Sequence, residues 1–233
     1  MHQTRYKKKQ NMHMLGMEET IQLLQDEIRE LQLTRQLMSL VPMNKTSWSV
    51  LTEYFRLFRF GVKPSGHVAA DNMYPFDPPV QRNFLLAAMA PDVTNVIMDG
   101  VDGVMETWEH ESLCFPGFWV DVMCLEDGPD GSIIVTTKHK FTISEATLHY
   151  MFPHLIHGSG EHSQLVNKLL RQKLLIQVFV HFEWDSETGR VNSFVSNADI
   201  VTPMLRLLGN LEDVSHVLKS SRMMPTRGVI VSM

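Results

Sequence analysis

The sequence predicts an N-terminal α-helical coiled coil followed by an α+β domain built on an antiparallel sheet. Three observations support this prediction: a heptad repeat in the first forty residues, a change of pattern at Pro42, and two pairs of long alternating segments in the second half. With 233 residues, the chain is long enough for one sizeable domain and an appendage. We therefore divide it into residues 1–41 and residues 42–233.

The first segment carries apolar residues at spacings that alternate between three and four, which is the a/d pattern of a coiled coil. The predicted dimerisation positions are Met14, Met17, Ile21, Leu24, Ile28, Leu31, Arg35 and Met38. Ile at a with Leu at d favours two parallel strands. Pro42 is expected to end the helix, because it has no N–H to donate and its ring clashes with the preceding turn.

Two alternatives for this helix stay open. Five further leucines lie outside the a and d positions, which together form the predicted seam, so the helix could instead be amphipathic and pack on its own domain. They are Leu15, Leu23, Leu33, Leu37 and Leu40. The seam is also weak, because Arg35 occupies an a position and His13–Glu18 is the single attractive g–e′ pair. A heterodimer with a stronger zipper is therefore as open as a homodimer.

The positive charge is concentrated at the N-terminus. Residues 1–12 hold Arg5, Lys7, Lys8 and Lys9 and no acidic residue, although the whole chain has a net charge of −5. From residue 44 onward there are 15 basic and 21 acidic residues. A surface that binds a polyanion is therefore expected near the N-terminus.

The basic run Arg5-Tyr6-Lys7-Lys8-Lys9-Gln10 precedes the heptads in phase, and Lys7 stands ten positions before Met17. Over residues 2–38 this combination resembles the bZIP family of transcription factors. The resemblance implies a dimer whose basic helices enter the major groove of double-stranded DNA. Lys7 would take the place of the family's essential Arg, and Tyr6 would face the bases.

The resemblance further implies a regulator of transcription that works in the nucleus. His2 and Gln3 would fall where base-contacting residues sit, and the remaining basic residues would contact phosphates. The DNA-binding set implied in this way is Gln3, Arg5, Tyr6, Lys7, Lys8 and Lys9.

Three features depart from the family pattern. The base-reading Asn is absent upstream of the basic run, Lys7 cannot form the two parallel hydrogen bonds of an Arg, and Gly16 costs a helix about 1 kcal/mol relative to Ala. Two explanations are open. Either the N-terminus is incomplete, or the basic region is weakened and the protein modulates its partners by dimerising without binding DNA well.

The second segment changes from helical to alternating patterns. A first helix is expected to begin at Thr46 or Ser47 and to end near Gly61. Further helices are predicted at 81–89 and 103–113, a loop at 63–79 and a short strand at 93–98. Strands are predicted at 120–125, 133–143, 174–184 and 190–200, followed by helical segments at 204–208 and 211–218.

This order of elements over residues 46–202 resembles the cone-shaped fold of nuclear transport factor 2, the ketosteroid isomerases and the SnoaL-like polyketide cyclases. The resemblance implies a curved antiparallel sheet with helices on one face and an apolar pocket for a small ligand. The alternative function is therefore a SnoaL-like cyclase or isomerase, or a small-ligand-binding module, with a helical N-terminal extension.

The sequence itself defines no catalytic constellation, so we do not predict an enzyme. The titratable candidates are expected to have structural roles, since no pair has a spacing that defines a mechanism; they are Tyr54, Asp121, His139, His181 and Asp199.

No metal site and no cofactor are predicted. The histidines with nearby carboxylates are His110, between Glu109 and Glu111, and the group His154, His157 and His162. Residues adjacent on a helix do not converge, and a Gly-Ser-Gly loop is a poor frame for ligands. Cys114 and Cys124 form no disulfide framework, and no run of eighteen apolar residues suggests a membrane span.

Overall fold

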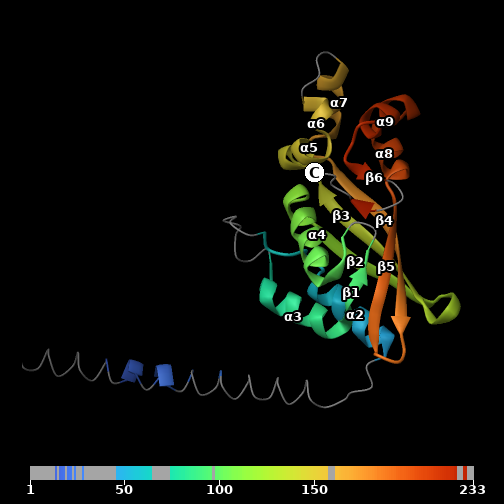
Figure 1. Cartoon of the computed structure of the whole chain (residues 1–233). Coiled ribbons are helices and arrows are strands. Elements are labelled where there is room, and N and C mark those ends of the chain that lie inside the picture. Colours follow the sequence, from blue (N-terminus) through green and yellow to red (C-terminus); the bar gives the residue numbers. More distant parts are fainter. Residues whose placement is uncertain are drawn as a thin grey trace, which may run out of the picture. The chain divides into compact units, whose positions relative to one another are not determined.

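The computed structural model describes residues 46–64, 74–95, 98–156, 161–224 and 228–229, together with positions between residues 14 and 28. The described N-terminal positions are Met14, Gly16–Glu18, Thr20–Gln22, Leu24 and Ile28. The chain divides into two compact units, Met1–Lys45 and Thr46–Met233 (Figure 1).

The second unit is built on a five-stranded sheet with the strand order β1-β5-β4-β3-β2. The strands are β1 (Met89–Thr94), β2 (Trp119–Asp127), β3 (Ile133–Thr142), β4 (Lys173–Asp185) and β5 (Arg190–Asp199). A short hairpin of β6 (Met223–Met224) and β7 (Gly228–Val229) follows near the C-terminus. The predicted α+β class is therefore confirmed.

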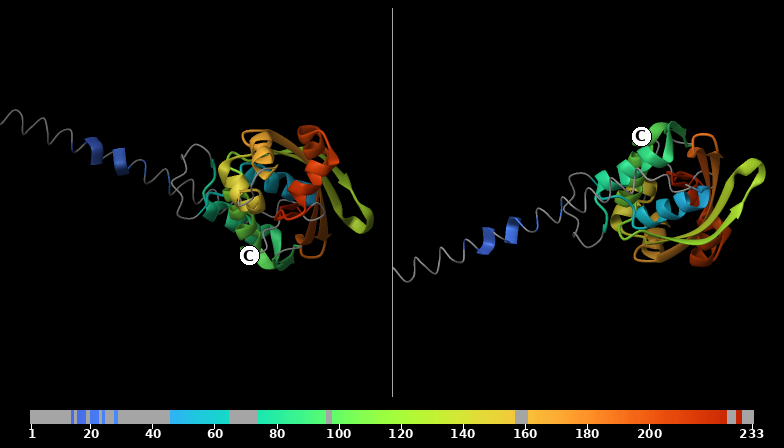
Figure 2. Two further views of the ribbon diagram at one scale, coloured as in Figure 1. Left: turned by 90° about the horizontal axis from the view of Figure 1, so that it is seen from above. Right: turned by 90° about the horizontal axis from the view of Figure 1, so that it is seen from below.

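Both long hairpins occur where the alternating patterns predicted them. β2 pairs antiparallel with β3, and β4 pairs antiparallel with β3 and β5. The turn between β2 and β3 contains a short 3-10 helix, η2 (Pro129–Gly131), in which Asp130 has a φ of 55°. Figure 2 shows this turn, in yellow-green, projecting from the rest of the unit.

The expectation of a wholly antiparallel sheet is wrong, because β1 pairs parallel with β5. The predicted strand 93–98 is also misplaced. Strand β1 begins four residues earlier, at Met89, directly after a helix, and ends at Thr94. Pro91 lies within it, which is compatible with its position at the edge of the sheet.

Three helices precede or flank β1: α2 (Ser47–Leu57), α3 (Pro78–Ala88) and α4 (Gly100–Cys114). The Thr46 side chain accepts a hydrogen bond from the Ser49 backbone N–H at 3.2 Å, as the predicted cap requires. Helix α2 ends before Gly61, which instead takes a φ of 76° in the following turn. Helix α3 starts inside the predicted loop, because proline is tolerated in the first helical turn.

The helices after β3 were largely missed. They are α5 (Glu145–Met151), α6 (Pro153–Ile156) and α7 (Glu161–Leu169), whereas the predicted helical tail is present as α8 (Val201–Leu208) and α9 (Leu211–Leu218). Ser144 begins α5 with a capping box, in which its side chain accepts from the Thr147 N–H at 3.1 Å.

One face of the sheet forms the core with the helices. On β4, Leu174, Ile176, Val178, Val180 and Phe182 are buried, while the intervening side chains point to the opposite face and are mostly exposed. The helices contribute residues such as Phe55, Trp108 and Met204 to the same core. Helices therefore cover one face of the sheet, as predicted.

Candidate functional site

The predicted seam is described at five of its eight positions. Met14, Met17, Ile21, Leu24 and Ile28 are all helical, and their exposed fractions are 51–58%. Leu31, Arg35 and Met38 lie outside the described residues, as does the whole implied DNA-binding set of Gln3 and Arg5–Lys9. A helical stripe of exposed apolar side chains is the feature that a coiled-coil partner would cover.

Inside the second unit, a buried polar group lies between α2 and α4. The Trp108 indole Nε1–H donates a hydrogen bond of 2.9 Å to the Tyr54 hydroxyl. Tyr54 also packs edge-on against Phe182 of β4, with the ring centroids 5.9 Å apart. Burial raises the pKa of Tyr54, so its hydroxyl keeps its proton.

Glu111 lies on α4 at the same face as Trp108, one turn further along the helix. Desolvation raises the pKa of its carboxyl group to about 8. When Glu111 is ionised, its negative charge further raises the pKa of Tyr54 and of the Cys114 thiol. Burial is the larger cause for Cys114, whose pKa rises to about 12. Glu111 is therefore mostly protonated at neutral pH and can donate a hydrogen bond.

His139 of β3 points to the same side of the sheet. Its Nε2 lies 3.0 Å from the Thr137 hydroxyl, and that hydroxyl donates to the Val178 carbonyl at 3.2 Å. The hydroxyl therefore accepts from Nε2–H, which leaves Nδ1 as the unprotonated nitrogen. The Phe118 ring stands edge-on to the imidazole at 5.1 Å, and desolvation lowers the pKa of His139 to about 4.

An aromatic chain links these groups. Phe118 lies 6.1 Å from Trp108, and Trp108 lies 6.1 Å from Tyr54, measured between ring centroids. We call Tyr54, Trp108, Glu111 and His139 the α4 cluster. Desolvation favours the neutral form of both its Glu111 carboxyl group and its His139 imidazole.

The other titratable candidates have structural roles on the opposite face or at element ends. Asp121 accepts from the Arg59 guanidinium at 2.6 Å and from the Trp119 indole at 3.0 Å. His181 lies 2.9 Å from the Ser132 hydroxyl. Asp199 accepts from the backbone N–H of Thr202, in the first turn of α8, at 3.1 Å.

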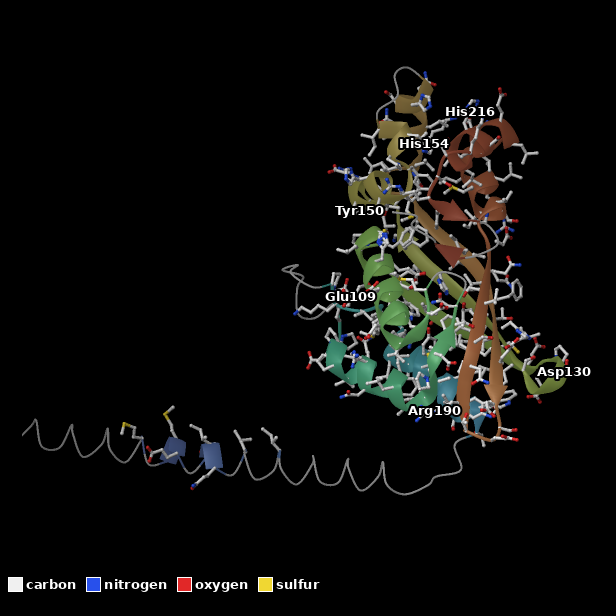
Figure 3. The ribbon with its side chains drawn as sticks, viewed as in Figure 1. Glu109, Asp130, Tyr150, His154, Arg190 and His216 are labelled. Atoms are coloured by element: carbon white, nitrogen blue, oxygen red, sulfur yellow. The ribbon has the colours of Figure 1, made fainter. Side chains whose placement is uncertain are left out.

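The histidines considered for a metal site do not converge. Within the part of the chain that the structure describes, no three His, Cys, Asp or Glu side chains could hold a metal ion. His110 lies 3.4 Å from the Cys114 sulfur, and His154 contacts the His216 carbonyl at 3.3 Å (Figure 3). His162 lies on α7, and His157 is outside the described residues.

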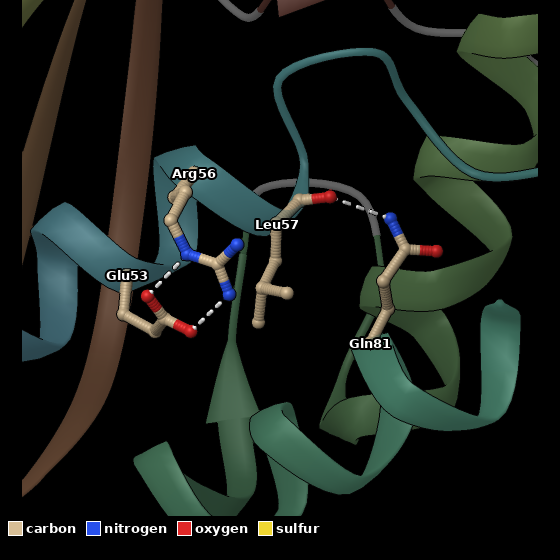
Figure 4. A network of polar contacts seen from close by, with 4 residues as sticks. All are labelled: Glu53, Arg56, Leu57 and Gln81. Atoms are coloured by element: carbon tan, nitrogen blue, oxygen red, sulfur yellow. Dashed lines mark hydrogen bonds and ion pairs between the residues drawn. The ribbon is translucent and has the colours of Figure 1, made fainter. Parts of the chain in front are cut away.

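A second polar contact fixes α2 against α3. The buried Gln81 amide donates to the carbonyls of Leu57 at 2.8 Å and Gly61 at 2.9 Å. Nearby, Arg56 and Glu53 form an exposed pair with two hydrogen bonds of 2.6 Å (Figure 4). Gln81 therefore satisfies carbonyls that the end of α2 leaves free.

Helices α2, α3 and α4 coincide with a family match. Residues 48–114 match the model of the bZIP transcription factor 1 C-terminal domain. The match begins shortly after the heptads and ends at the last residue of α4. No curated protein matches the chain.

Solved structures with a similar course of the backbone include three bacterial proteins. One is a protein of Acidithiobacillus ferrooxidans assigned as a polyketide cyclase, with 13% identity, a TM-score of 0.45, and coverage of 72% of this chain and 97% of that one. A SnoaL-like polyketide cyclase from Agrobacterium tumefaciens has 10% identity, a TM-score of 0.43 and coverage of 69% and 96%. TsrD from Streptomyces laurentii has 11% identity, a TM-score of 0.42 and coverage of 70% and 98%.

Among the described residues, the structure contains no helix with both the length and the apolar character that a membrane span requires.

Proposed function

We propose that the protein is a dimerising, DNA-binding transcription regulator of the bZIP type. The observation that carries the proposal is the order of two features along the chain. A helical stripe with half-exposed Met14, Met17, Ile21, Leu24 and Ile28 precedes a segment that matches a bZIP factor's C-terminal domain. Two such helices would pair through their seams, and the basic N-terminal segments of the two chains would then enter the major groove of one DNA duplex from opposite sides.

The basic arm supplies salt-dependent affinity, and Lys7 is its central residue. Each Lys or Arg that neutralises a phosphate releases counterions, so binding weakens as salt rises. Because lysine does not form a bidentate contact, we expect weaker base discrimination than an Arg would give. A protein of this kind acts in the nucleus, which we include in the proposal.

Disulfide trapping tests the pairing of the helices. In a Cys124→Ser background, which removes the exposed native thiol, Leu24→Cys is expected to form an interchain disulfide under mild oxidation. Equivalent d positions of a parallel coil face each other, whereas Gln22→Cys, two residues earlier on the exposed side, serves as the matched control. Equal trapping of the two variants, or no trapping of the Leu24→Cys chain, would contradict self-pairing through this seam.

A second candidate function is the binding of a small molecule at the α4 cluster. The observation in its favour is that the aromatic chain Tyr54, Trp108 and Phe118 leads to the neutral His139 imidazole, while burial on α4 raises the pKa of the Glu111 carboxyl group to about 8. A buried carboxylic acid donates a hydrogen bond to a carbonyl oxygen, and a neutral imidazole nitrogen accepts one. A compact apolar molecule with a carbonyl group suits this pair.

Binding of acetonaphthone, an aromatic ketone, tests the second candidate through the fluorescence of the tryptophans. We expect saturable quenching at neutral pH that Glu111→Gln retains and Glu111→Ala loses, since Gln still donates a hydrogen bond. Glu109→Ala is the matched control on the same helix. Equal affinity of all variants would dismiss the α4 cluster as a binding site.

A further inference from the structure

Among the described residues, strand β2 pairs with β3 alone and so forms one edge of the sheet. The backbone N–H of Val120 points to the free side of this edge, where it donates to the Arg59 carbonyl at 2.8 Å. Backbone groups alternate in direction along an antiparallel strand, so the N–H and C=O groups of Val122 point to the free side as well. A bulge follows Val122 and adds one residue, so the next groups that point outward belong to Leu125 and Asp127.

Most of this edge is open. Within the described part of the chain, the hydrogen bond between Val120 and Arg59 is the only backbone–backbone bond on the free side of β2. The outward groups of Val122, Leu125 and Asp127 therefore face solvent or another strand. An unpaired edge of this kind is a template for an extended chain, whose own backbone groups continue the ladder of hydrogen bonds.

Exposed apolar side chains accompany the edge from its start to its end. On β2, Trp119, Val122 and Met123 are 38%, 38% and 53% exposed. Trp48 of α2 is 42% exposed and reaches the far end of the strand, where its indole N–H donates to the Asp127 carboxylate at 3.1 Å. Exposed apolar side chains that gather in this way mark interaction surfaces. We call these four side chains, together with the backbone groups that point outward between Val122 and Asp127, the β2 edge.

One end of the β2 edge is acidic. Glu126 and Asp127 end the strand, and Asp130 lies at the tip of the β2–β3 hairpin, which projects from the rest of the unit (Figure 3). Among the described residues, none of these three carboxylates takes part in an ion pair. Near the start of the strand, by contrast, the Asp121 carboxylate lies 2.6 Å from the Arg59 guanidinium, which neutralises it. The edge therefore offers unpaired negative charge beside the hairpin tip but not at its start.

From these observations we infer that the β2 edge binds an extended segment of another protein, which adds to the sheet as an antiparallel strand. The segment has apolar residues at alternate positions and Lys or Arg residues at its N-terminal end. Antiparallel pairing places that end beside the hairpin tip, where Glu126 and Asp130 lie. Backbone hydrogen bonds to Val122, Leu125 and Asp127 supply affinity, and the apolar and charged side chains fix the register.

A second copy of this chain fits the β2 edge less well. Antiparallel pairing of the open stretch with itself would bring Glu126 and Asp127 of both chains into one short contact without a cation among them. A cationic segment removes this repulsion. The inference does not depend on the proposed function, because it requires neither a coiled coil nor DNA.

The probe for this edge is a synthetic peptide, Lys-Lys-Ser-Val-Thr-Val-Thr-Trp-Ser, with a fluorescent label at its C-terminus. Its binding to the full chain is followed by fluorescence anisotropy, and saturation is expected. Val122→Pro removes an outward N–H and spares the bonds to β3, since proline is tolerated at a sheet edge. We expect Val122→Pro to weaken binding about tenfold or more, whereas Val122→Thr keeps the N–H and should bind within about twofold of the wild-type chain.

Charge reversal tests the acidic end. Glu126→Lys is expected to weaken binding of the probe about fivefold. A second peptide, with two Glu in place of the two Lys, should reverse this order and bind the Glu126→Lys chain more tightly than the wild-type chain. A variant that had merely lost its fold could not exchange its preference in this way. Glu187→Lys, in the exposed β4–β5 turn, is the matched control and should leave both affinities unchanged.

Two further measurements separate strand addition from a contact made by side chains alone. The same peptide, N-methylated at both valines and both threonines, keeps every side chain and charge but loses the N–H groups that pair, so it is expected not to bind. Hydrogen exchange followed by NMR should show that saturation with the unmethylated peptide slows the backbone amides of Val122 and Leu125.

Three results would overturn the inference. The first is the absence of saturable binding of the probe to the full chain. The second is equal affinity of the Val122→Pro and Val122→Thr chains, or of the methylated and unmethylated peptides. The third is protection of the Val122 and Leu125 amides that rises with the concentration of the chain alone, which would assign the edge to a second copy.

Discussion

At the scale of single residues, replacing Gln81 is predicted to lower the free energy of unfolding. Gln81→Met keeps the volume of the side chain but leaves the carbonyls of Leu57 and Gly61 without their donor. Because these groups are buried, we expect the free energy of unfolding to fall by about 2–4 kcal/mol. Urea denaturation followed by tryptophan fluorescence measures the change.

The neighbouring pair offers a matched control. Glu53→Gln removes the exposed ion pair with Arg56 and is expected to change the free energy of unfolding by about 0.5 kcal/mol or less. A loss of equal size in both variants would show that Gln81 does not hold α2 against α3.

Glu111 gives a prediction for pH dependence. Its folded pKa of about 8 lies above the ordinary value of 4.5, so the unfolded chain releases the proton first. This group therefore stabilises the fold at low pH, and the contribution falls as pH rises from 4.5 to 8. Glu111→Gln is expected to remove a slope approaching about 1.4 kcal/mol per pH unit, as measured by urea denaturation at several pH values.

His139 acts with the opposite sign. Its folded pKa of about 4 lies below the ordinary 6.5, so its contribution to stability is lost as pH falls from 6.5 to 4. At acid pH the contributions of Glu111 and His139 to the free energy of unfolding change in opposite directions. Between pH 6.5 and pH 8, only the contribution of Glu111 changes. A wild-type slope in that interval that persists unchanged in Glu111→Gln would contradict the assignment.

The sequence could have indicated Glu111 but not its pKa. Val104, Trp108 and Glu111 share one helical face, which placed the carboxylate beside a buried indole. The desolvation that raises its pKa, however, depends on tertiary packing, which no local pattern reports. Tyr54 and His139 were candidates from the start, but no local pattern showed that Phe118 and Trp108 would connect them.

At the scale of elements, α4 depends on a glycine at a point of close approach. A Cβ at Gly103 would lie 2.5 Å from the Met98 Cβ and 3.2 Å from its carbonyl carbon. Gly103→Ala is therefore expected to destabilise the protein by about 1 kcal/mol or more, although Ala is the better helix former. Glu106→Ala, at an exposed position of α4, is the control. A higher melting temperature for Gly103→Ala would contradict the close packing.

The elements that the sequence predicted best are those whose information is local. The β4–β5 hairpin was predicted because buried Ile176, Val178, Val180 and Phe182 recur at every second position of β4 and a polar turn separates the strands. The pairing of β1 with β5 joins Met89 to Val191, a contact between distant segments that no periodicity reports. The Ser144–Thr147 capping box could have indicated the start of α5. The helix was not predicted because its seven residues are too few to show a clear apolar period.

At the scale of the whole molecule, the proposed function gives separate tasks to the two units. Residues 1–45 contain the proposed zipper and basic arm, and residues 46–233 form a core of their own beneath the sheet. The charge distribution fits this assignment, because a body richer in acidic residues does not attract DNA by itself.

The most direct test of the central claim is the salt dependence of binding to a labelled DNA duplex, measured by fluorescence anisotropy. The full chain is expected to bind with an affinity that falls steeply as salt rises. Lys7→Ala should weaken binding and reduce that salt slope by about 1 for each arm, and Leu24→Pro should abolish the complex. Unchanged binding in both variants, or none by the full chain, would contradict a bZIP-type regulator.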